Sequence, residues 1–183
     1  RLRKTHSTNL YLQEQLQTGH IPADETIVVT DFQTAGRGQT GNTWESEAGQ
    51  NLTFSLLYHP ASLPANESFR IAQIAALSVK RMLDRYVRDI TVKWPNDVYR
   101  KEQKICGILI ENLLSGKFIA HSILGIGLNI NQQIFRSDAP NPVSLAQITG
   151  KTYDRMTLLE AWHTEFRQLR ALLEAGNVVA LHA

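Results

Sequence analysis

The chain has 183 residues, of which 43% are hydrophobic and 20% charged, a length and composition that predict one globular domain over residues 1–183 and exclude a disordered or membrane-spanning chain. The formal net charge of +2 is too small to indicate a nucleic-acid-binding protein. A single cysteine, Cys106, excludes a disulfide scaffold and is typical of a reducing compartment, so we expect a cytoplasmic protein.

The first half of the chain predicts two helices and two strands around a glycine-rich loop. Residues 7–19 begin with a Ser or Thr cap and end at a glycine, which is typical of a helix. Residues 26–30 and 52–58 are largely apolar and predict strands. Between them, residues 32–50 hold four of the eleven glycines and predict a loop. Residues 67–87 carry apolar side chains at spacings of three and four, which predicts a second helix.

The second half predicts short strands and a final helix. Strands are expected at residues 90–93, 105–110 and 118–128, the first of them ended by Pro95. Residues 145–148 indicate a helical turn. Thr157 and Glu160 predict a capping box for a last helix that ends near Gly176. Because the strands of residues 90–130 have hairpin-length links, the predicted fold class is α+β, with a mixed, largely antiparallel sheet and helices packed on one face.

Motifs of several common enzyme classes are absent. The sequence has no P-loop phosphate motif, no third glycine after Gly125 and Gly127 for a dinucleotide fingerprint, no H-E-x-x-H and no G-x-S-x-G. The six histidines are scattered, so no zinc site is expected. The sequence therefore gives no motif support for a P-loop kinase, a Rossmann dehydrogenase, a zinc protease or an α/β-hydrolase.

The glycine-rich loop is the most unusual segment. Residues 35–44 read A-G-R-G-Q-T-G-N-T-W, and closely spaced glycines let backbone N–H groups approach an anion. Arg37 lies between two of these glycines and can grip a phosphate or carboxylate with its planar guanidinium. Trp44 suits either a core anchor or a cover over a flat ligand. The alternative for the whole segment is a mobile surface loop with one solvated arginine.

A second unusual segment reads K-W-P-N-D at residues 93–97, and Lys104 and Gly107 follow it. Two lysines and an aspartate near a strand end suit a ligand with phosphates and a divalent cation, because ammonium groups bind oxyanions and a carboxylate binds Mg²⁺. The alternative is a tight turn in which Asn96 and Asp97 only cap backbone groups.

Together these segments resemble the biotin protein ligases. The catalytic domain of that family carries, in order, an S-T-N at its first helix, a G-R-G-x-x-G-x-x-W loop, a K-W-P-N-D turn, a K-x-x-G-I-L strand start and a late G-x-G-x-N. This chain has them at Ser7 to Asn9, Gly36 to Trp44, Lys93 to Asp97, Lys104 to Leu109 and Gly125 to Asn129. The K-W-P-N-D turn followed by K-x-x-G-I-L is the most specific part.

The resemblance implies a two-step reaction. Biotin would be activated with ATP to biotinyl-5′-AMP and then transferred to a lysine of a biotin carboxyl carrier domain of a carboxylase. The implied cofactors are ATP and biotin as substrates with Mg²⁺, and neither a nucleic acid nor a membrane is expected as a partner. A homodimer through an exposed sheet edge stays open.

The resemblance also implies roles for individual residues. Lys104 and Arg37 are the implied catalytic residues, and Asp97 is the implied Mg²⁺ ligand. The implied contacts to biotin or biotinyl-AMP are Ser7, Thr8, Asn9, Gln33, Gly36, Arg37, Gly38, Gln39, Lys104 and Gly107, and those to ATP are Trp44, Lys93, Asn96, Asp97 and Asn129. Simpler alternatives stay open: Ser7 as a plain N-cap, the glycines at 107, 125 and 127 as strand bulges, and Cys106 without a chemical role.

The chain also departs from the family pattern. Many members have arginine where this chain has Gln39 and Asn42, so we expect a weaker hold on the adenylate. Six residues precede Ser7, which resembles the ligase-only class without an N-terminal DNA-binding domain, and the family's C-terminal β-barrel is absent from this chain. Two other functions stay open as alternatives. One is a lipoyl or octanoyl ligase, although the R-R-x-x-G-G-G loop usual in that group is not seen, and the other is a non-catalytic biotin-binding module.

Overall fold

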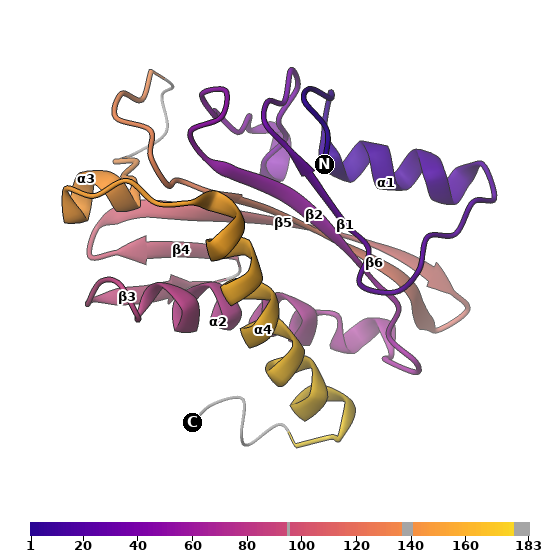
Figure 1. Ribbon diagram of the computed structural model, residues 1–183. Coiled ribbons are helices and arrows are strands. Elements are labelled where there is room, and N and C mark those ends of the chain that lie inside the picture. Colours follow the sequence, from indigo (N-terminus) through magenta and orange to yellow (C-terminus); the bar gives the residue numbers. More distant parts are fainter. Residues whose placement is uncertain (95, 137–140, 178–183) are drawn as a thin grey trace.

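The computed structural model describes residues 1–94, 96–136 and 141–177, and Pro95, the expected strand end, lies outside them. The described residues form four α-helices, six strands and two short 3₁₀ helices, with four strands in succession between α2 and α3 (Figure 1). In order they are α1 (Thr8–Gln17), β1 (Ile27–Thr30), η1 (Gln39–Gly41), β2 (Leu52–Tyr58), η2 (Ala65–Glu67), α2 (Phe69–Leu83), β3 (Ile90–Lys93), β4 (Asp97–Arg100), β5 (Gln103–Ser115), β6 (Phe118–Leu128), α3 (Leu145–Thr149) and α4 (Arg155–Glu174).

The six strands form one sheet in the order β1-β2-β6-β5-β4-β3. Every neighbouring pair is antiparallel, so the predicted α+β class is confirmed. The sequence interpretation missed β4, which the K-W-P-N-D segment connects to β3 with Lys93 directly opposite Asp97. β5 is also longer than the predicted 105–110.

The main core lies on the sheet face covered by α2 and α4. Residues at every second position of the central strands point there, and Phe54 packs edge-on against Trp162 of α4 with 4.6 Å between ring centroids. Burial of such apolar area is the main stabilising contribution in a domain of this size. The expectation of helices on one face holds for these two helices.

α1 lies on the opposite face, away from α2 and α4 (Figure 1). Its Leu12 packs with Leu57 of β2 and Ile123 of β6 in a second, smaller cluster. Further along the same face, beside Leu109, the strands carry mostly small residues, namely Thr53, Ser55, Gly107, Gly125 and Gly127. The face is therefore filled by a helix at one end and left hollow at the other.

The predicted capping box at Thr157 and Glu160 is wrong. α4 begins at Arg155, and the side chain of Asp154 accepts a hydrogen bond from the Thr157 backbone N–H at 2.7 Å. Thr157 is thus the third residue of the helix, and its backbone N–H needs a hydrogen-bond acceptor there. Asp154 supplies that acceptor and is the N-cap residue. A capping box is found instead at α3, between Ser144 and Gln147.

Candidate active site

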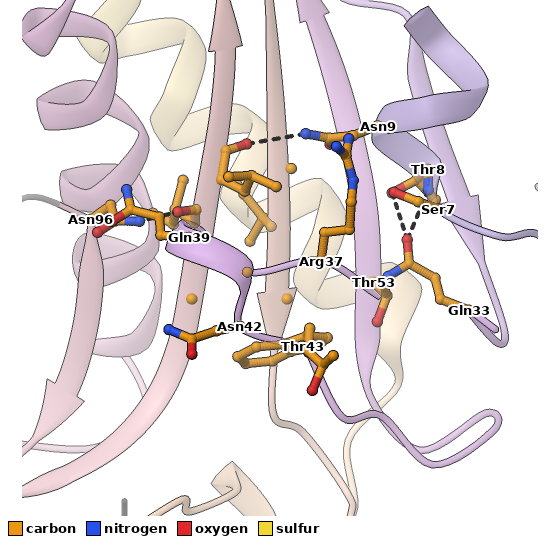
Figure 2. A pocket seen from close by; sticks show the side chains of 18 of the residues that line it. Ser7, Thr8, Asn9, Gln33, Arg37, Gln39, Asn42, Thr43, Thr53 and Asn96 are labelled. Carbon is orange, nitrogen blue, oxygen red and sulfur yellow. Dashed lines mark hydrogen bonds between the residues drawn. The ribbon is translucent and has the colours of Figure 1, made fainter. Parts of the chain in front are cut away.

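A cavity of about 220 Å³ opens over the hollow part of the sheet (Figure 2). Its walls come from the start of α1, the glycine-rich loop, and strands β2, β4, β5 and β6. Twelve of the fifteen implied site residues line it: Ser7, Thr8, Asn9, Gln33, Arg37, Gly38, Gln39, Trp44, Asn96, Asp97, Lys104 and Gly107. Gly36, Lys93 and Asn129 are not among its lining residues.

The glycine-rich loop forms a small hairpin rather than an open cradle. The Trp44 N–H donates to the Gly36 carbonyl at 2.9 Å, and the Gly38 N–H donates to the Asn42 carbonyl at 2.7 Å. Helix η1 makes the tip, where Gly41 has a φ of +79° that L-residues rarely adopt. The hairpin covers one side of the cavity and brings Arg37 over it.

Trp44 lies on a floor made by two glycines. Gly107 of β5 and Gly127 of β6 are cross-strand partners, and a Cβ atom on either would overlap the Trp44 indole. Pairing is regular through both positions, so they are not strand bulges. Trp44 belongs to neither apolar cluster, and its Nε1 is buried without a hydrogen-bond partner among the described residues. The indole therefore rests on a flat backbone surface.

The start of α1 supplies neutral hydrogen-bonding groups. Ser7 occupies the N-cap position, but its side chain does not cap the helix. Instead, Gln33 Oε1 accepts from the Thr8 N–H at 2.8 Å and from Thr8 Oγ1 at 3.1 Å. Ser55 Oγ lies 2.5 Å from Asn9 Oδ1. Both amide oxygens are thus engaged, which leaves Gln33 Nε2 as a donor for a ligand.

A β-bulge aims Lys104 into the cavity. Val98 of β4 pairs with Cys106 and Tyr99 pairs with Lys104, so Ile105 is an extra residue in β5. Ile105 and Cys106 are both buried in the main core, and Lys104 is turned to the other face. Its Nζ lies 2.8 Å from Asp97 Oδ2. The cavity therefore holds an ion pair of partly exposed groups.

The remaining implied residues have distinct surroundings. Asn96 is buried and its amide donates to the Ile108 carbonyl. Lys93 is exposed on β3, with Nζ 5.3 Å from the centre of the Tyr99 ring. Asn129 directly follows β6 and is 2% exposed, and its Oδ1 has no hydrogen-bond partner among the described residues. Asn129 Oδ1 is one of several buried side-chain atoms of the described residues without a hydrogen-bond partner.

Sequence reasoning missed Glu111. Its carboxylate accepts from Arg37 Nη2 at 2.9 and 3.0 Å and from Asn9 Nδ2 at 2.8 Å. The available signal was a lone acidic side chain within the apolar stretch I-L-I-E-N-L-L of β5. Its partners could not be predicted, because Arg37 and Glu111 are 74 positions apart.

Three further findings concern Cys106, grouped metal ligands and membrane-spanning helices. Burial raises the pKa of the Cys106 thiol well above its usual range, which agrees with the expectation of no chemical role. Among residues 1–94, 96–136 and 141–177, no three His, Cys, Asp or Glu side chains are grouped to hold a metal ion. None of the described helices has the length and apolar composition needed to cross a membrane.

Comparison with known proteins decides the family. Residues 2–129 match the model of the biotin/lipoate A/B protein ligase family. The chain belongs to this family. The matched range contains every implied site residue, from Ser7 to Asn129.

Individual relatives agree with this assignment. The bifunctional ligase/repressor BirA of Bacillus spizizenii is 33% identical over 152 residues, which cover 80% of this chain and 46% of that protein. The biotin–[acetyl-CoA-carboxylase] ligase of Paracoccus denitrificans is 29% identical over 179 residues, covering 94% and 73%. The biotin protein ligase of Aquifex aeolicus, solved with biotin and ATP, superposes with a TM-score of 0.79 at 30% identity, covering 95% of this chain and 70% of that one.

Proposed function

We propose that this chain activates biotin with ATP to biotinyl-5′-AMP and transfers the biotinyl group to a lysine of a carboxyl carrier domain. The support comes from the family assignment and from the relatives that are named as biotin ligases. The chain spans about half the length of the Bacillus relative, and the cavity itself gives further support.

One observation carries the proposal: uncharged hydrogen-bonding groups lie at one end of the cavity and the Lys104–Asp97 ion pair at the other, with Arg37 between them (Figure 2). Ser7, Thr8 and Gln33 lie on one side of the view in Figure 2, and Asn96 lies on the other, next in sequence to Asp97 and its partner Lys104. Biotin has the same polarity, with an uncharged ureido ring at one end and a carboxylate at the other. Buried donors and acceptors matched in this way fix a ligand's orientation.

The charged end suits the first step. The biotin carboxylate attacks the α-phosphorus of ATP, the bond to the bridging oxygen breaks, and pyrophosphate leaves with the electron pair. Two unit charges 4 Å apart repel by about 4 kcal/mol at an effective dielectric constant near 20. Lys104 and Arg37 offset this repulsion and stabilise the charge that develops on the phosphate oxygens.

The second step needs an incoming lysine amine and a protected intermediate. The amine attacks the acyl carbon of biotinyl-5′-AMP, AMP leaves, and the amine proton is lost to solvent. The hairpin of residues 36–44 is the part of the site suited to cover the adenylate and exclude water. No covalent enzyme intermediate is needed, which agrees with the absence of a nucleophile motif in the sequence.

The nucleotide requires the hairpin to move. A cavity of about 220 Å³ is smaller than the roughly 300–1,000 Å³ of typical ligand sites, and the Trp44 indole fills the space over Gly107 and Gly127. We expect Trp44 to lift from this floor and lie against the nucleotide. Asn129, with its unsatisfied Oδ1, is the residue best suited to a nucleotide hydrogen bond.

Mg²⁺ fits the site as a companion of the phosphates. Mg²⁺ keeps several waters and takes one or two carboxylates together with substrate phosphates, and Asp97 supplies one carboxylate at the charged end of the cavity. The cation would neutralise phosphate charge there. Lys93 lies outside the cavity lining and is proposed to contact the outer phosphates.

The decisive experiment is intact-mass analysis of a carrier domain incubated with this chain, MgATP and either biotin or lipoate. We expect the mass of one biotinyl group to be added to the carrier, and no addition with lipoate or with the Lys104→Ala variant. Transfer of lipoate alone would establish a lipoyl ligase, which the family also contains. Biotin binding without any transfer would establish the non-catalytic module.

A further inference from the structure

We propose that Glu111 is a positioning residue, which sets the side chains of Arg37 and Asn9 for the carboxylate and ring of biotin. This inference rests on the proposed function for the identity of the ligand. Glu111 itself is not among the residues lining the cavity, so it acts through its two partners.

The strand register places Glu111 beside the site. Gly107, Leu109 and Glu111 alternate with the core residues of β5 and therefore share the hollow face of the sheet. Gly107 and Leu109 line the cavity, and Glu111 is the next residue on that face, opposite Ile123 of β6. A carboxylate at this position reaches both the hairpin and the start of α1.

Three side chains from two separate segments converge on this carboxylate. Arg37 Nη2 donates to both oxygens at 2.9 and 3.0 Å. Asn9 Nδ2 donates at 2.8 Å, and Gln13 Nε2 donates from the next turn of α1 at 3.4 Å. Asn9 and Arg37 both line the cavity. Glu111 therefore connects α1 and the hairpin, two parts of the site that are separate in the sequence.

The geometry leaves Arg37 able to bind a ligand while it is held. Only Nη2 of its guanidinium contacts Glu111, and Nε and Nη1 make no hydrogen bond to the described residues. A guanidinium has five N–H donors in a rigid plane. Fixing one nitrogen therefore fixes the direction in which the others point, which reduces the rotamer freedom lost on binding.

A purely structural ion pair is the simpler explanation, and it makes a different prediction. The two side chains are 38% and 22% exposed, and pairs this accessible contribute little to the stability of a fold. A positioning role predicts a change in ligand affinity without a change in melting temperature. It also predicts that the effect of Glu111 becomes smaller once Arg37 is removed, because only the hydrogen bonds from α1 then remain.

The test compares Glu111→Gln, Glu111→Asp, Arg37→Ala and the double variant Arg37→Ala/Glu111→Gln in biotin-dependent pyrophosphate exchange. Glu102→Gln, at an exposed turn between β4 and β5, is the matched control for loss of one negative charge. We expect Glu111→Gln to raise the KM for biotin about tenfold, the lower range for a lost charge-assisted hydrogen bond, with kcat within about twofold. Glu111→Asp should recover part of the loss.

The double variant decides between the two explanations. If Glu111 acts partly through Arg37, Glu111→Gln should raise KM by a clearly smaller factor in the Arg37→Ala background than in the wild type. Equal KM values for Glu111→Gln and Glu102→Gln, or an undiminished effect in the Arg37→Ala background, would overturn the proposal.

A second readout needs no activity. Trypsin cleaves after Arg37 only when that side chain is free, so Glu111→Gln should be cut there several times faster than the wild type, with cleavage after Lys101 in an exposed turn as the reference. If the wild type shows no exchange, the proposed function fails, and the cleavage rate still decides whether Glu111 holds Arg37. Equal cleavage rates would refute that hold.

Discussion

Lys104 Nζ lies 2.8 Å from Asp97 Oδ2, across the two strands β4 and β5. The contact exists because one extra residue, Ile105, turns Lys104 away from the core. The lysine is thus held beside the carboxylate of Asp97 at the edge of the cavity. Its role can be tested without disturbing the core, because the pair is partly exposed.

Replacing this lysine should remove most of the adenylation activity. Lys104→Ala is expected to slow biotin-dependent pyrophosphate exchange by about 10²–10³-fold, the usual effect of losing one donor to a developing oxyanion. The melting temperature should change little. A rate close to that of the wild type would remove Lys104 from the reaction.

Two glycines of β6 should have separable effects. A Cβ at Gly127 would overlap the Trp44 indole, whereas a Cβ at Gly125 would overlap the Asn9 side chain. Gly127→Ala should therefore displace Trp44 and change its fluorescence in the free protein. Gly125→Ala should leave that emission unchanged and weaken biotin binding. Trp44→Phe identifies the emission that belongs to Trp44.

Two results would contradict separate roles for Gly125 and Gly127. If both alanine variants changed the Trp44 emission equally, the two ends of the cavity would not be independent. If neither variant affected binding of biotin or ATP by calorimetry, the floor of the cavity would not be where the ligands bind.

Gln39 offers a gain-of-function test. Many family members resembling this chain have arginine at this position, and a charged donor to phosphate is worth about 1.5–3 kcal/mol. Gln39→Arg should therefore slow the release of biotinyl-5′-AMP by about 10- to 100-fold, measured by filter binding after a chase with unlabelled biotin. Gln39→Leu, which removes the hydrogen-bonding groups of the side chain, serves as the comparison. Equal release rates for wild type and Gln39→Arg would contradict the expected weak hold.

The histidine pair on β6 and after β2 predicts a pH dependence of stability. Burial, and then the neighbouring His59, lower the pKa of His121, and the two rings lie 4.7 Å apart. The folded state therefore binds the proton less readily than the unfolded chain. As the pH falls through the unfolded value of 6.5, the unfolded chain takes up the proton first and the free energy of unfolding decreases.

Urea denaturation at pH 7.5 and pH 5.5 measures this effect. The loss of unfolding free energy on acidification should be smaller in His121→Gln than in the wild type. His20→Gln, at an exposed position, should retain the full loss. If His121→Gln also retained it, another group would be responsible.

Most of the fold could be predicted from the sequence, because the strands of residues 52–58 and 118–128 and the helix of α2 have long, regular apolar patterns. β4 was missed because it has four residues and one buried side chain, Val98, which is too short a pattern to recognise. β5 was cut short because Glu111 and Asn112 interrupt its apolar stretch, although strand alternation continues through them.

The candidate site was also predicted only in part from the sequence. Motifs predicted which residues gather at the cavity, since twelve of fifteen line it. They could not predict how those residues are held. The resting position of Trp44 depends on the pairing of Gly107 with Gly127, and the direction of Arg37 depends on Glu111 in a distant strand. These relationships come from strand register, which no local pattern records.

The unequal filling of the two sheet faces has an evolutionary consequence. The large apolar side chains lie mainly with α2 and α4, while the face that binds the hairpin carries Gly and Ser or Thr at its hollow end. Changes among these small residues reshape the cavity next to Trp44 and Asn9 and leave the apolar area of the main core buried. Sequence changes at the hollow end can therefore alter what the cavity accommodates while the apolar core beneath α2 and α4 stays the same.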